Sequence, residues 1–399
     1  MKEVCYLNSN DGTGILGYGV SEKLIAHGQH QLEAIEAFLK RNKEKHVFAC
    51  FSYDLKNEIE ALHSHNTDEM HFPNYILWVP RYVVQLQKEN FTFLQGEKTT
   101  EIFEFLNEFL EHETNVNFHH FDIDFNTRTP KEKYIQKVNE LKQSIQKGDV
   151  YEVNYCQEFY AENVEIPFPL DTYFKLNNIT RAPFSGFVNI EDYLIFCGSP
   201  ERYIQLEGKT LISQPIKGTA PRGETEIHDE NLKIELSKDV KERAENIMIV
   251  DLVRNDFSRI AQKGTVRVDE LCEIYSFETV HQMISTISCE PRKEVNFTDI
   301  LKATFPMGSM TGAPKISAMN LIEESEDFKR GIYSGSIGYF SPNGNFDFNV
   351  VIRSLVYNKK SKYLSCAVGG AITTLSDAEK EYDECLVKVK KILDGMHAF

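Results

Sequence analysis

The spacing of hydrophobic residues predicts helices in three separate stretches of the chain. Residues 101–113, EIFEFLNEFLEHE, gather their apolar side chains on one helical face. Residues 130–147 form a second predicted helix that Gly148 is expected to end. Its apolar stripe consists of Tyr134, Val138, Leu141 and Ile145. A third helix is predicted near the end of the sequence, with Gly395 as its last boundary.

Two of these helices are preceded by the residue pattern of a capping box. Thr129 stands three residues before Glu132, and Pro130 takes the first helical position. Ser376 stands three residues before Glu379 in the same way. The sequence therefore predicts that the side chains of Thr129 and Ser376 cap the two helices.

Other stretches carry the β-branched, aromatic and apolar residues that are typical of strands. They are residues 191–206, 331–357 and 362–372, and the second is expected to be a hairpin that turns at residues 342–344. Strands that do not alternate regularly with helices favour an α+β fold. A polar connector at 114–130 suggests a boundary between an N-terminal part, 1–125, and a main region, 126–399.

Composition narrows the class of protein. The chain has 399 residues, 41% of them hydrophobic, so it can bury a large core. Its formal charge of −16 argues against nucleic acid or an anionic membrane as a partner. The N-terminus lacks an apolar signal core, and no run reaches the roughly 18 apolar residues of a membrane span. Eight cysteines include no C-x-x-C pair, so we expect a cytoplasmic protein with reduced thiols.

Two pairs of glutamates have the spacing that places both side chains on one face of a helix. Glu242 and Glu245 form the first pair, and Glu381 and Glu384 form the second, with Lys388 one turn further along. Carboxylates from two helices could converge on Mg²⁺, which prefers oxygen ligands. The pattern is equally that of two solvated charged faces.

Glycine-rich turns supply further candidates. In FPMGSMTGAPK, Gly308 and Gly312 flank Ser309, and free backbone N–H groups there would favour an anion. A second glycine turn in AVGGAI and Arg353 at a strand end would suit a small molecule with carboxylates. Tight turns and a surface arginine explain the same residues without a ligand.

Three titratable residues stand in unusual surroundings. Lys217 lies in QPIKGTAPRG between prolines and glycines, where it could be a nucleophile, an anion-binding group or an ordinary loop charge. Glu201 follows a proline at the end of an apolar strand, so burial could keep it protonated as a general acid. His281 lies in an apolar segment and is either a core residue or a catalytic one.

These segments occur in the order found in one family. SPERY, PIKGTAPRG, ERAENIMIVDLVRNDFSRI, FPMGSMTGAPK, GIYSGSIGYF, NVVIRSL and EKEYDECLVK together make residues 134–393 resemble the chorismate-utilising enzymes. The resemblance implies a single large sandwich of antiparallel sheets with outer helices. It also implies that Mg²⁺ is bound by Glu242, Glu245, Glu381 and Glu384. Substrate contacts are implied for Gly218, Thr219, Ser309, Tyr333, Arg353, Gly369, Ala371 and Lys388.

Lys217 distinguishes between branches of the family. Anthranilate-forming members resemble PIAGT at this place, whereas aminodeoxychorismate synthases, which make the 4-aminobenzoate precursor for folate, carry PIKGT as here. The resemblance implies that Lys217 attacks C2 of chorismate while Glu201 protonates the leaving C4 hydroxyl. Ammonia then adds at C4 and expels the lysine. His281 matches the histidine of the family's site.

Departures from the family pattern limit the alternatives. Isochorismate-forming members have a lysine base where this chain has Glu152, and the LLES stretch associated with tryptophan feedback is absent from the sequence. No cysteine lies in a Gly-x-Cys-x-Gly turn, so ammonia is expected from a separate glutamine amidotransferase subunit. Anthranilate synthesis, isochorismate synthesis and non-catalytic chorismate binding remain the competing hypotheses.

Overall fold

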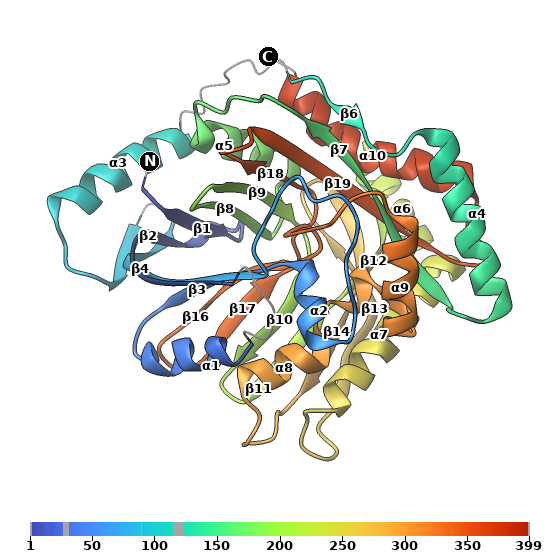
Figure 1. Ribbon diagram of the computed structural model, residues 1–399, viewed down its shortest axis with the longest axis horizontal. Helices are drawn as coiled ribbons and strands as arrows, with labels where there is room; N and C mark the ends of the chain where they lie inside the picture. Colours follow the sequence, from blue (N-terminus) through green and yellow to red (C-terminus); the bar gives the residue numbers. More distant parts are fainter. Residues whose placement is uncertain (1, 27–31, 89, 115–122, 398–399) are drawn as a thin grey trace.

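The computed structural model describes residues 2–26, 32–88, 90–114 and 123–397. Its strands form one hydrogen-bonded network of 19 strands, folded into a sandwich with helices outside (Figure 1). The α+β prediction is confirmed. The strands are β1 Val4–Asn8, β2 Thr13–Ala26, β3 Val47–Phe51, β4 Tyr75–Gln87, β5 Asn90–Gln95, β6 Asn126–Thr127, β7 Glu152–Ala161, β8 Phe184–Ile190, β9 Tyr193–Ser199, β10 Arg202–Glu207, β11 Thr210–Gln214, β12 Ile216–Pro221, β13 Arg267–Ser276, β14 Val280–Cys289, β15 Gly312–Ala313, β16 Ser336–Phe340, β17 Phe346–Asn349, β18 Ser354–Asn358 and β19 Tyr363–Ile372.

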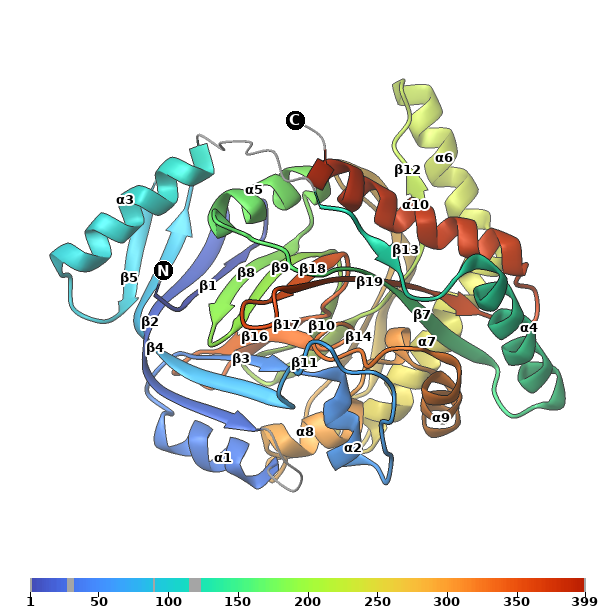
Figure 2. The same ribbon diagram turned by 45° about the horizontal axis from the view of Figure 1, so that its top comes forward.

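The helices lie on two outer sides of the strands. Helices α3, α5, α10 and α4 run along one side, and α1, α8 and α7 along the other (Figures 1 and 2). Helix α6 projects from the body beside β12 and β13, as Figure 2 shows. The helices are α1 Leu32–Arg41, α2 Lys56–Ile59, α3 Thr100–Thr114, α4 Lys131–Lys147, α5 Pro169–Thr180, α6 Glu226–Lys238, α7 Val240–Ser258, α8 Phe297–Thr304, α9 Lys315–Ser325 and α10 Ala378–His397.

The first strands of the chain pair with strands that come much later. β1 lies antiparallel to β8, with Val4 opposite Asn189, and β3 lies antiparallel to β16, with Phe51 opposite Ser336. Burial of apolar residues from both parts produces shared cores, one of which joins Tyr6 and Phe109 to Tyr134 and Leu364. Of the predicted connector at 114–130, residues 115–122 lie outside the described residues.

Hydrophobic periodicity identified α4 correctly, but its predicted cap is wrong. The whole stripe is buried, and Gly148 ends the helix in the left-handed conformation. At the other end the N-cap residue is Pro130, whose side chain has no hydrogen-bonding group. The Thr129 hydroxyl, which is the predicted cap of the helix, instead donates to Asp327 Oδ2 at 3.0 Å. A tertiary contact has replaced the local one.

Helix α10 shows a similar correction at both ends. Asp377, and not Ser376, accepts hydrogen bonds from the backbone N–H groups of Glu379 and Lys380, at 3.2 and 3.1 Å. The Ser376 hydroxyl instead accepts from Thr373 N. Gly395 does not end the helix, which continues to His397.

The predicted strand segments are present, but two of them are divided into several shorter strands. Residues 191–206 form β9 and β10, and the hairpin at 342–344 joins β16 to β17. Segment 331–357 also holds a third strand, β18, because the chain turns at Arg353 with a φ of 52°. Arg353 therefore lies in a turn between two strands that belong to the same network.

Candidate active site

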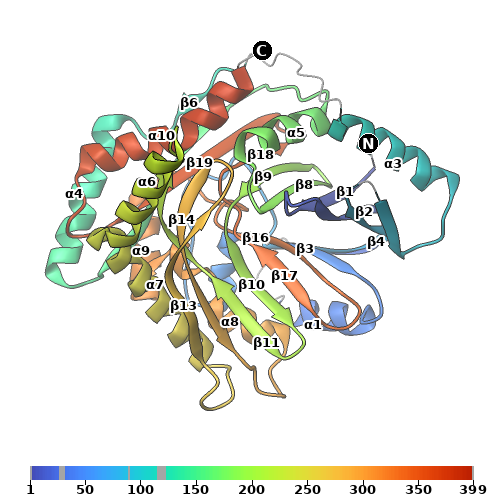
Figure 3. The same cartoon turned by 180° about the vertical axis from the view of Figure 1, so that it is seen from behind.

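A cavity of 720 Å³ lies where β12 and β19 meet helices α7 and α10. Figure 3 shows α10 beside β19 and α7 beside β13 and β14. The cavity brings together all but one of the sequence-predicted site residues. They are Glu201, Lys217, Gly218, Thr219, Glu242, Glu245, Ser309, Tyr333, Arg353, Gly369, Ala371, Glu381, Glu384 and Lys388.

Lys217 is held in the cavity wall by an irregular part of β12. Strand β12 pairs with β14 but shifts register between Ile216 and Thr219, so the segment bulges at Lys217 and Gly218. Gly218 has a φ of 91°, and a side chain there would meet Glu242 at 3.2 Å. The glycine therefore allows the strand to approach α7 while Lys217 faces the cavity.

The ammonium group of Lys217 is paired with a carboxylate from another part of the chain. Lys217 Nζ donates to Glu152 Oε1 at 2.8 Å, and the side chains are only 11% and 1% exposed. Burial by itself would lower the pKa of Lys217, but the charges of Glu152, Glu245 and Glu201 together raise it to about 12. In the structure Lys217 is therefore a charged group.

The environment of Glu201, in contrast to that of Lys217, favours the uncharged form of the side chain. It follows β9 in a buried turn, and its Oε1 accepts a hydrogen bond from the Ser309 hydroxyl at 2.6 Å. Burial raises the pKa of this carboxyl to about 7, although Ser309, Lys217 and Arg353 each oppose the rise. Near neutral pH, Glu201 can therefore hold a proton and act as a general acid.

The four glutamates predicted to bind metal line one part of the cavity from α7 and α10. Glu245 is buried, and its Oε1 has no hydrogen-bond partner among the described residues. Burial raises the pKa of Glu245 to about 7. Burial would also raise the pKa of Glu384, but Lys388, whose Nζ lies 2.8 Å from Glu384 Oε1, holds it below its usual value.

A lysine that the sequence analysis missed lies between the two acidic pairs. Lys241 Nζ is 3.8 Å from Glu245 Oε1 and 3.5 Å from Glu381 Oε1. Over the ranges that the structure describes, no three acidic, histidine or cysteine side chains are grouped as a metal-ion site. The oxygen donors suit a hard cation, and Glu245 Oε1 accepts no hydrogen bond in the described chain. Lys241 occupies the space between these donors.

Positive groups complete the cavity. Arg353 faces it, and no side chain or backbone group of the described chain hydrogen-bonds its guanidinium. Burial lowers the pKa of Arg353, against the attraction of Glu201. Lys388 Nζ donates to Gly369 O at 3.1 Å beside the close contact of β19 with β7. A small anion entering here would meet the guanidinium of Arg353, which has no hydrogen-bond partner in the described chain.

His281 is the predicted site residue that the structure places elsewhere. It is 1% exposed and does not line the cavity. Its Nε2 lies 2.9 Å from Asp229 on α6, and its Nδ1 lies 2.8 Å from the Ser276 hydroxyl. Its neighbour Gln282 does line the cavity, and both side-chain polar atoms of Gln282 lack partners within the described ranges. In a strand, adjacent residues face opposite sides, which the sequence position alone could have suggested.

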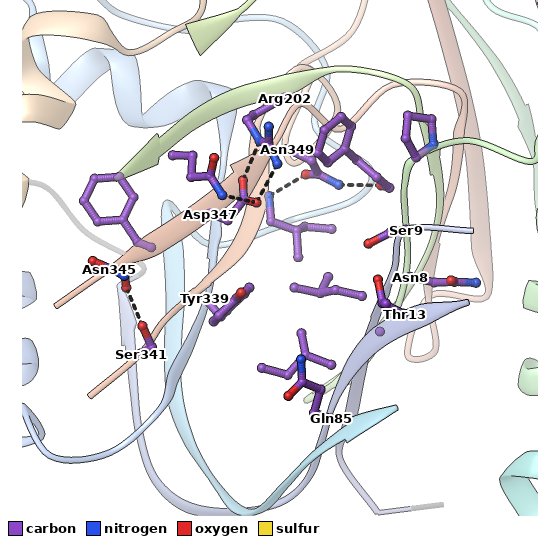
Figure 4. A pocket seen from close by; sticks show the side chains of 18 of the residues that line it. Asn8, Ser9, Thr13, Gln85, Arg202, Tyr339, Ser341, Asn345, Asp347 and Asn349 are labelled. Carbon is purple, nitrogen blue, oxygen red and sulfur yellow. Dashed lines mark hydrogen bonds and ion pairs between the residues drawn. The ribbon is translucent and has the colours of Figure 1, made fainter. Parts of the chain in front are cut away.

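A second cavity, of 380 Å³, is lined in part by residues of β10, which begins at Arg202. Figure 4 shows Arg202 and Asp347 joined to each other, with Asn8 and Thr13 on the opposite side of the cavity. Arg202 forms two hydrogen bonds of 3.0 Å to the Asp347 carboxylate and a third of 2.6 Å to Gln214. The Arg202–Asp347 pair in this cavity is satisfied, whereas His46 Nδ1, which also lines the cavity, is buried without a hydrogen-bond partner in the described chain. The sequence did not predict this cavity.

None of the described helices is long and apolar enough to cross a membrane. Among known proteins, the chain is 39% identical over 270 residues to aminodeoxychorismate synthase component 1 of Escherichia coli (strain K12), covering 68% of this chain and 59% of that protein. It is 41% identical over 261 residues to the protein of that name in Salmonella typhimurium, covering 65% and 57%. The aligned part of the chain thus spans less than two thirds of the length of these curated relatives.

Structural similarity extends over almost the whole chain. The crystal structure of anthranilate synthase component I from Streptococcus pneumoniae TIGR4 superposes with a TM-score of 0.80 at 26% identity, covering 95% of this chain and 92% of that one. The family described as chorismate binding enzyme matches residues 2–394, which include every element that lines the larger cavity. By sequence and by fold, the chain is a member of the chorismate binding enzyme family.

Proposed function

We propose that the protein aminates chorismate at C4 to give 4-amino-4-deoxychorismate. The observation that carries the proposal is the placement of Lys217 and Glu201 in one cavity, an amine beside a carboxyl that can be protonated near neutral pH. The similarity to aminodeoxychorismate synthase component 1 from two bacteria supports the choice of C4. Arg353 and Lys388 suit the carboxylates of the substrate.

In the proposed reaction the free amine of Lys217 forms a bond to C2 of chorismate. The ring double bonds shift, and the C4 hydroxyl leaves as water with the proton of Glu201. Ammonia then forms a bond to C4, the bond between C2 and Lys217 breaks, and its electron pair returns to the lysine nitrogen. Glu201 recovers its proton from the new ammonium group. The sum is chorismate and ammonia giving the amino product and water.

We propose Glu242, Glu245, Glu381 and Glu384 as the residues that hold Mg²⁺, with Lys241 moving away from Glu245 and Glu381. When bound, the cation would neutralise a substrate carboxylate and help to orient the ring. The Glu245 oxygen that lacks a hydrogen bond and the oxygen-only donor set support this assignment. For His281 we propose a positioning role in place of the expected catalytic one: its ring contacts Asp229 on α6 and Ser276, and it can orient its neighbour Gln282.

We also propose that ammonia comes from a separate glutamine amidotransferase. All eight cysteines are buried, and none stands in a nucleophile turn of the Gly-x-Cys-x-Gly type. Free ammonium should replace that partner in vitro, as it supplies the same nucleophile.

The test is to incubate the protein with chorismate, Mg²⁺ and ammonium and to identify products by mass and fluorescence. We expect 4-amino-4-deoxychorismate. Anthranilate, which is fluorescent, would show amination at C2, and isochorismate would show that water is the nucleophile. Bound but unreacted chorismate would leave only a binding function. Each of these three results would refute the proposal.

A further inference from the structure

Glu152 is a buried carboxylate to which the proposed reaction has so far given no task. It is the first residue of β7, and it is held where β7 pairs with the short strand β15, opposite Ala313. One carboxylate oxygen accepts the hydrogen bond from Lys217. The other, Oε2, is buried and has no hydrogen-bond partner in the described chain. Glu152 lies behind Lys217, outside the surface that lines the cavity.

The hydrogen bond between Lys217 and Glu152 favours the ammonium form of Lys217, which cannot attack chorismate, but it also offers a path for removing the extra proton. A lysine attacks carbon only as the free amine, and its strong pairing keeps it as the ammonium. If the proton went to solvent, Glu152 would remain as an isolated buried anion, which is a costly arrangement. If the proton moved along the existing hydrogen bond, both partners would become neutral. That transfer creates no new buried charge, so burial does not oppose it.

Other carboxylates near Lys217 are less suited to accept its proton. The charges of Glu201 on the turn after β9, Glu245 and Glu242 on α7, and Glu384 on α10 all act on this lysine or are affected by it. Among the described residues, however, Glu152 alone is within ion-pair distance of Lys217 Nζ. Glu201 must keep its own proton for the departing hydroxyl.

We propose that Glu152 takes the proton from Lys217 before the attack on chorismate and returns it when the lysine is released. This inference rests on the proposed function, because it assigns a proton acceptor to the lysine that the reaction requires. One N–H bond of Lys217 breaks, one O–H bond forms on Glu152, and the nitrogen electron pair then forms the bond to C2. When ammonia has displaced the lysine, the neutral amine recovers the proton from Glu152.

The experiment measures the rate at which chorismate forms an adduct on the protein without ammonia, by rapid quench and intact mass, from neutral to alkaline pH. It compares the wild type with Glu152→Gln and Glu152→Asp. The ratio of wild-type to variant rate is the quantity of interest, because titration of Glu201 affects both proteins and cancels. At neutral pH we expect Glu152→Gln to be slower by on the order of 10²-fold.

The inference predicts that this ratio decreases as the pH rises. In Glu152→Gln the lysine must lose its proton to solvent, so its rate should rise about tenfold per pH unit relative to the wild type. Glu152→Asp keeps a carboxylate and should keep the wild-type pH dependence at a lower rate. Asp256→Asn is a matched control, since Asp256 pairs with Lys315 at 2.6 Å with similar burial outside the larger cavity.

Three results separate the possibilities. If the ratio of the wild-type rate to the Glu152→Gln rate does not change with pH, the inference is overturned and Glu152 has a structural role. The same holds if Glu152→Gln forms no adduct at any pH. A Glu152→Gln rate equal to that of the wild type at neutral pH would also overturn it. Failure of the wild type itself to form an adduct would refute the proposed covalent function, which is a different outcome. Circular dichroism and thermal unfolding of all variants confirm that they are folded.

Discussion

Glu201 and Arg202 are adjacent in sequence but belong to two different cavities. Glu201 lines the larger one, and Arg202 lines the smaller one. In the smaller cavity Asp347 accepts three hydrogen bonds, two from Arg202 at 3.0 Å and one from Gln205 at 3.2 Å. In the larger cavity Arg353, Gln282 and one oxygen of Glu245 lack such partners within the described ranges.

We infer from this difference that the charged residues of the smaller cavity stabilise the fold, whereas those of the larger cavity are available to bind a ligand or to react. A paired buried ion contributes to structure, whereas a buried polar group without a partner costs free energy. Such a cost is common at functional sites, where the missing partner is a ligand. The larger cavity has the pattern expected of a site for an anionic substrate and a cation, whereas Arg202 and Asp347 of the smaller cavity satisfy each other's hydrogen bonds.

The largest expected effect in the larger cavity comes from Lys217. Lys217→Ala should slow amination by at least about 10³-fold, because the covalent route is lost. Lys217→Arg should be almost as slow, since a guanidinium stays protonated and cannot attack. Product formation at saturating ammonium measures both. An arginine variant with near wild-type turnover would mean that residue 217 only binds an anion.

Glu201 should give the next largest effect. Glu201→Gln keeps the contact with Ser309 but cannot give a proton, so turnover should fall by roughly 10²- to 10⁴-fold. The pKa of about 7 also predicts that wild-type kcat/KM decreases above neutral pH, as the active acid form is lost. The glutamine variant should lack that decrease. If it retained the decrease, another group would have to be the acid.

Glu245 should reveal the free-energy cost of burying a carboxylate whose Oε1 accepts no hydrogen bond in the described chain. Its pKa is about 7 when folded and near 4.5 when unfolded, so the folded state binds more protons between these values and loses stability as the pH rises. Glu245→Gln should therefore raise the free energy of unfolding by about 1 to 3 kcal/mol above neutral pH, and by little below pH 4.5. Metal-free urea unfolding at several pH values measures this.

The same variant should lose Mg²⁺-dependent turnover, and Glu384→Ala should do so as well. The two readouts are independent, since one concerns unfolding without metal and the other concerns activity with it. Full Mg²⁺ dependence in both variants would exclude these glutamates as ligands. A lower stability of Glu245→Gln at alkaline pH would contradict the charge assignment.

Asp347 in the smaller cavity should behave in the opposite way. Asp347→Asn removes the charged partner of Arg202, so unfolding should become easier by about 1 to 3 kcal/mol. Turnover of the folded protein should change less than about threefold, because surface and structural changes away from a site act mainly on stability. Thermal unfolding and steady-state kinetics of one preparation test both parts. A large loss of turnover with unchanged stability would break the distinction between the cavities.

Local patterns in the sequence predicted the elements well and their ends less well. The stripe of α4 and the hairpin at 342–344 depend on periodicity and turn residues, which act within a few positions. The cap predicted at Thr129 failed because its hydroxyl bonds to Asp327, far along the chain. A competing partner brought close by folding cannot be seen in a local pattern.

The candidate site shows the same division. Spacing alone predicted that Glu242 and Glu245 share one helical face and that Glu381 and Glu384 share another. The order of the motifs predicted that the two helices meet, and in the structure all four side chains line one cavity. The contact of Lys217 with Glu152 joins residues from different strands and had no signal in the spacing. Alternation along a strand could have suggested that His281 and Gln282 face opposite sides, but the contact of His281 with Asp229 in the projecting helix α6 had no signal in the sequence.

The most direct test of Lys217 as the nucleophile is peptide mapping of the protein after incubation with chorismate and Mg²⁺ in the absence of ammonia. The expected result is one adduct, with the mass of chorismate less one water, on the peptide that contains Lys217. Addition of ammonium should remove it and release 4-amino-4-deoxychorismate. An unmodified protein that still aminates chorismate at C4 when ammonium is present would contradict the covalent role of Lys217.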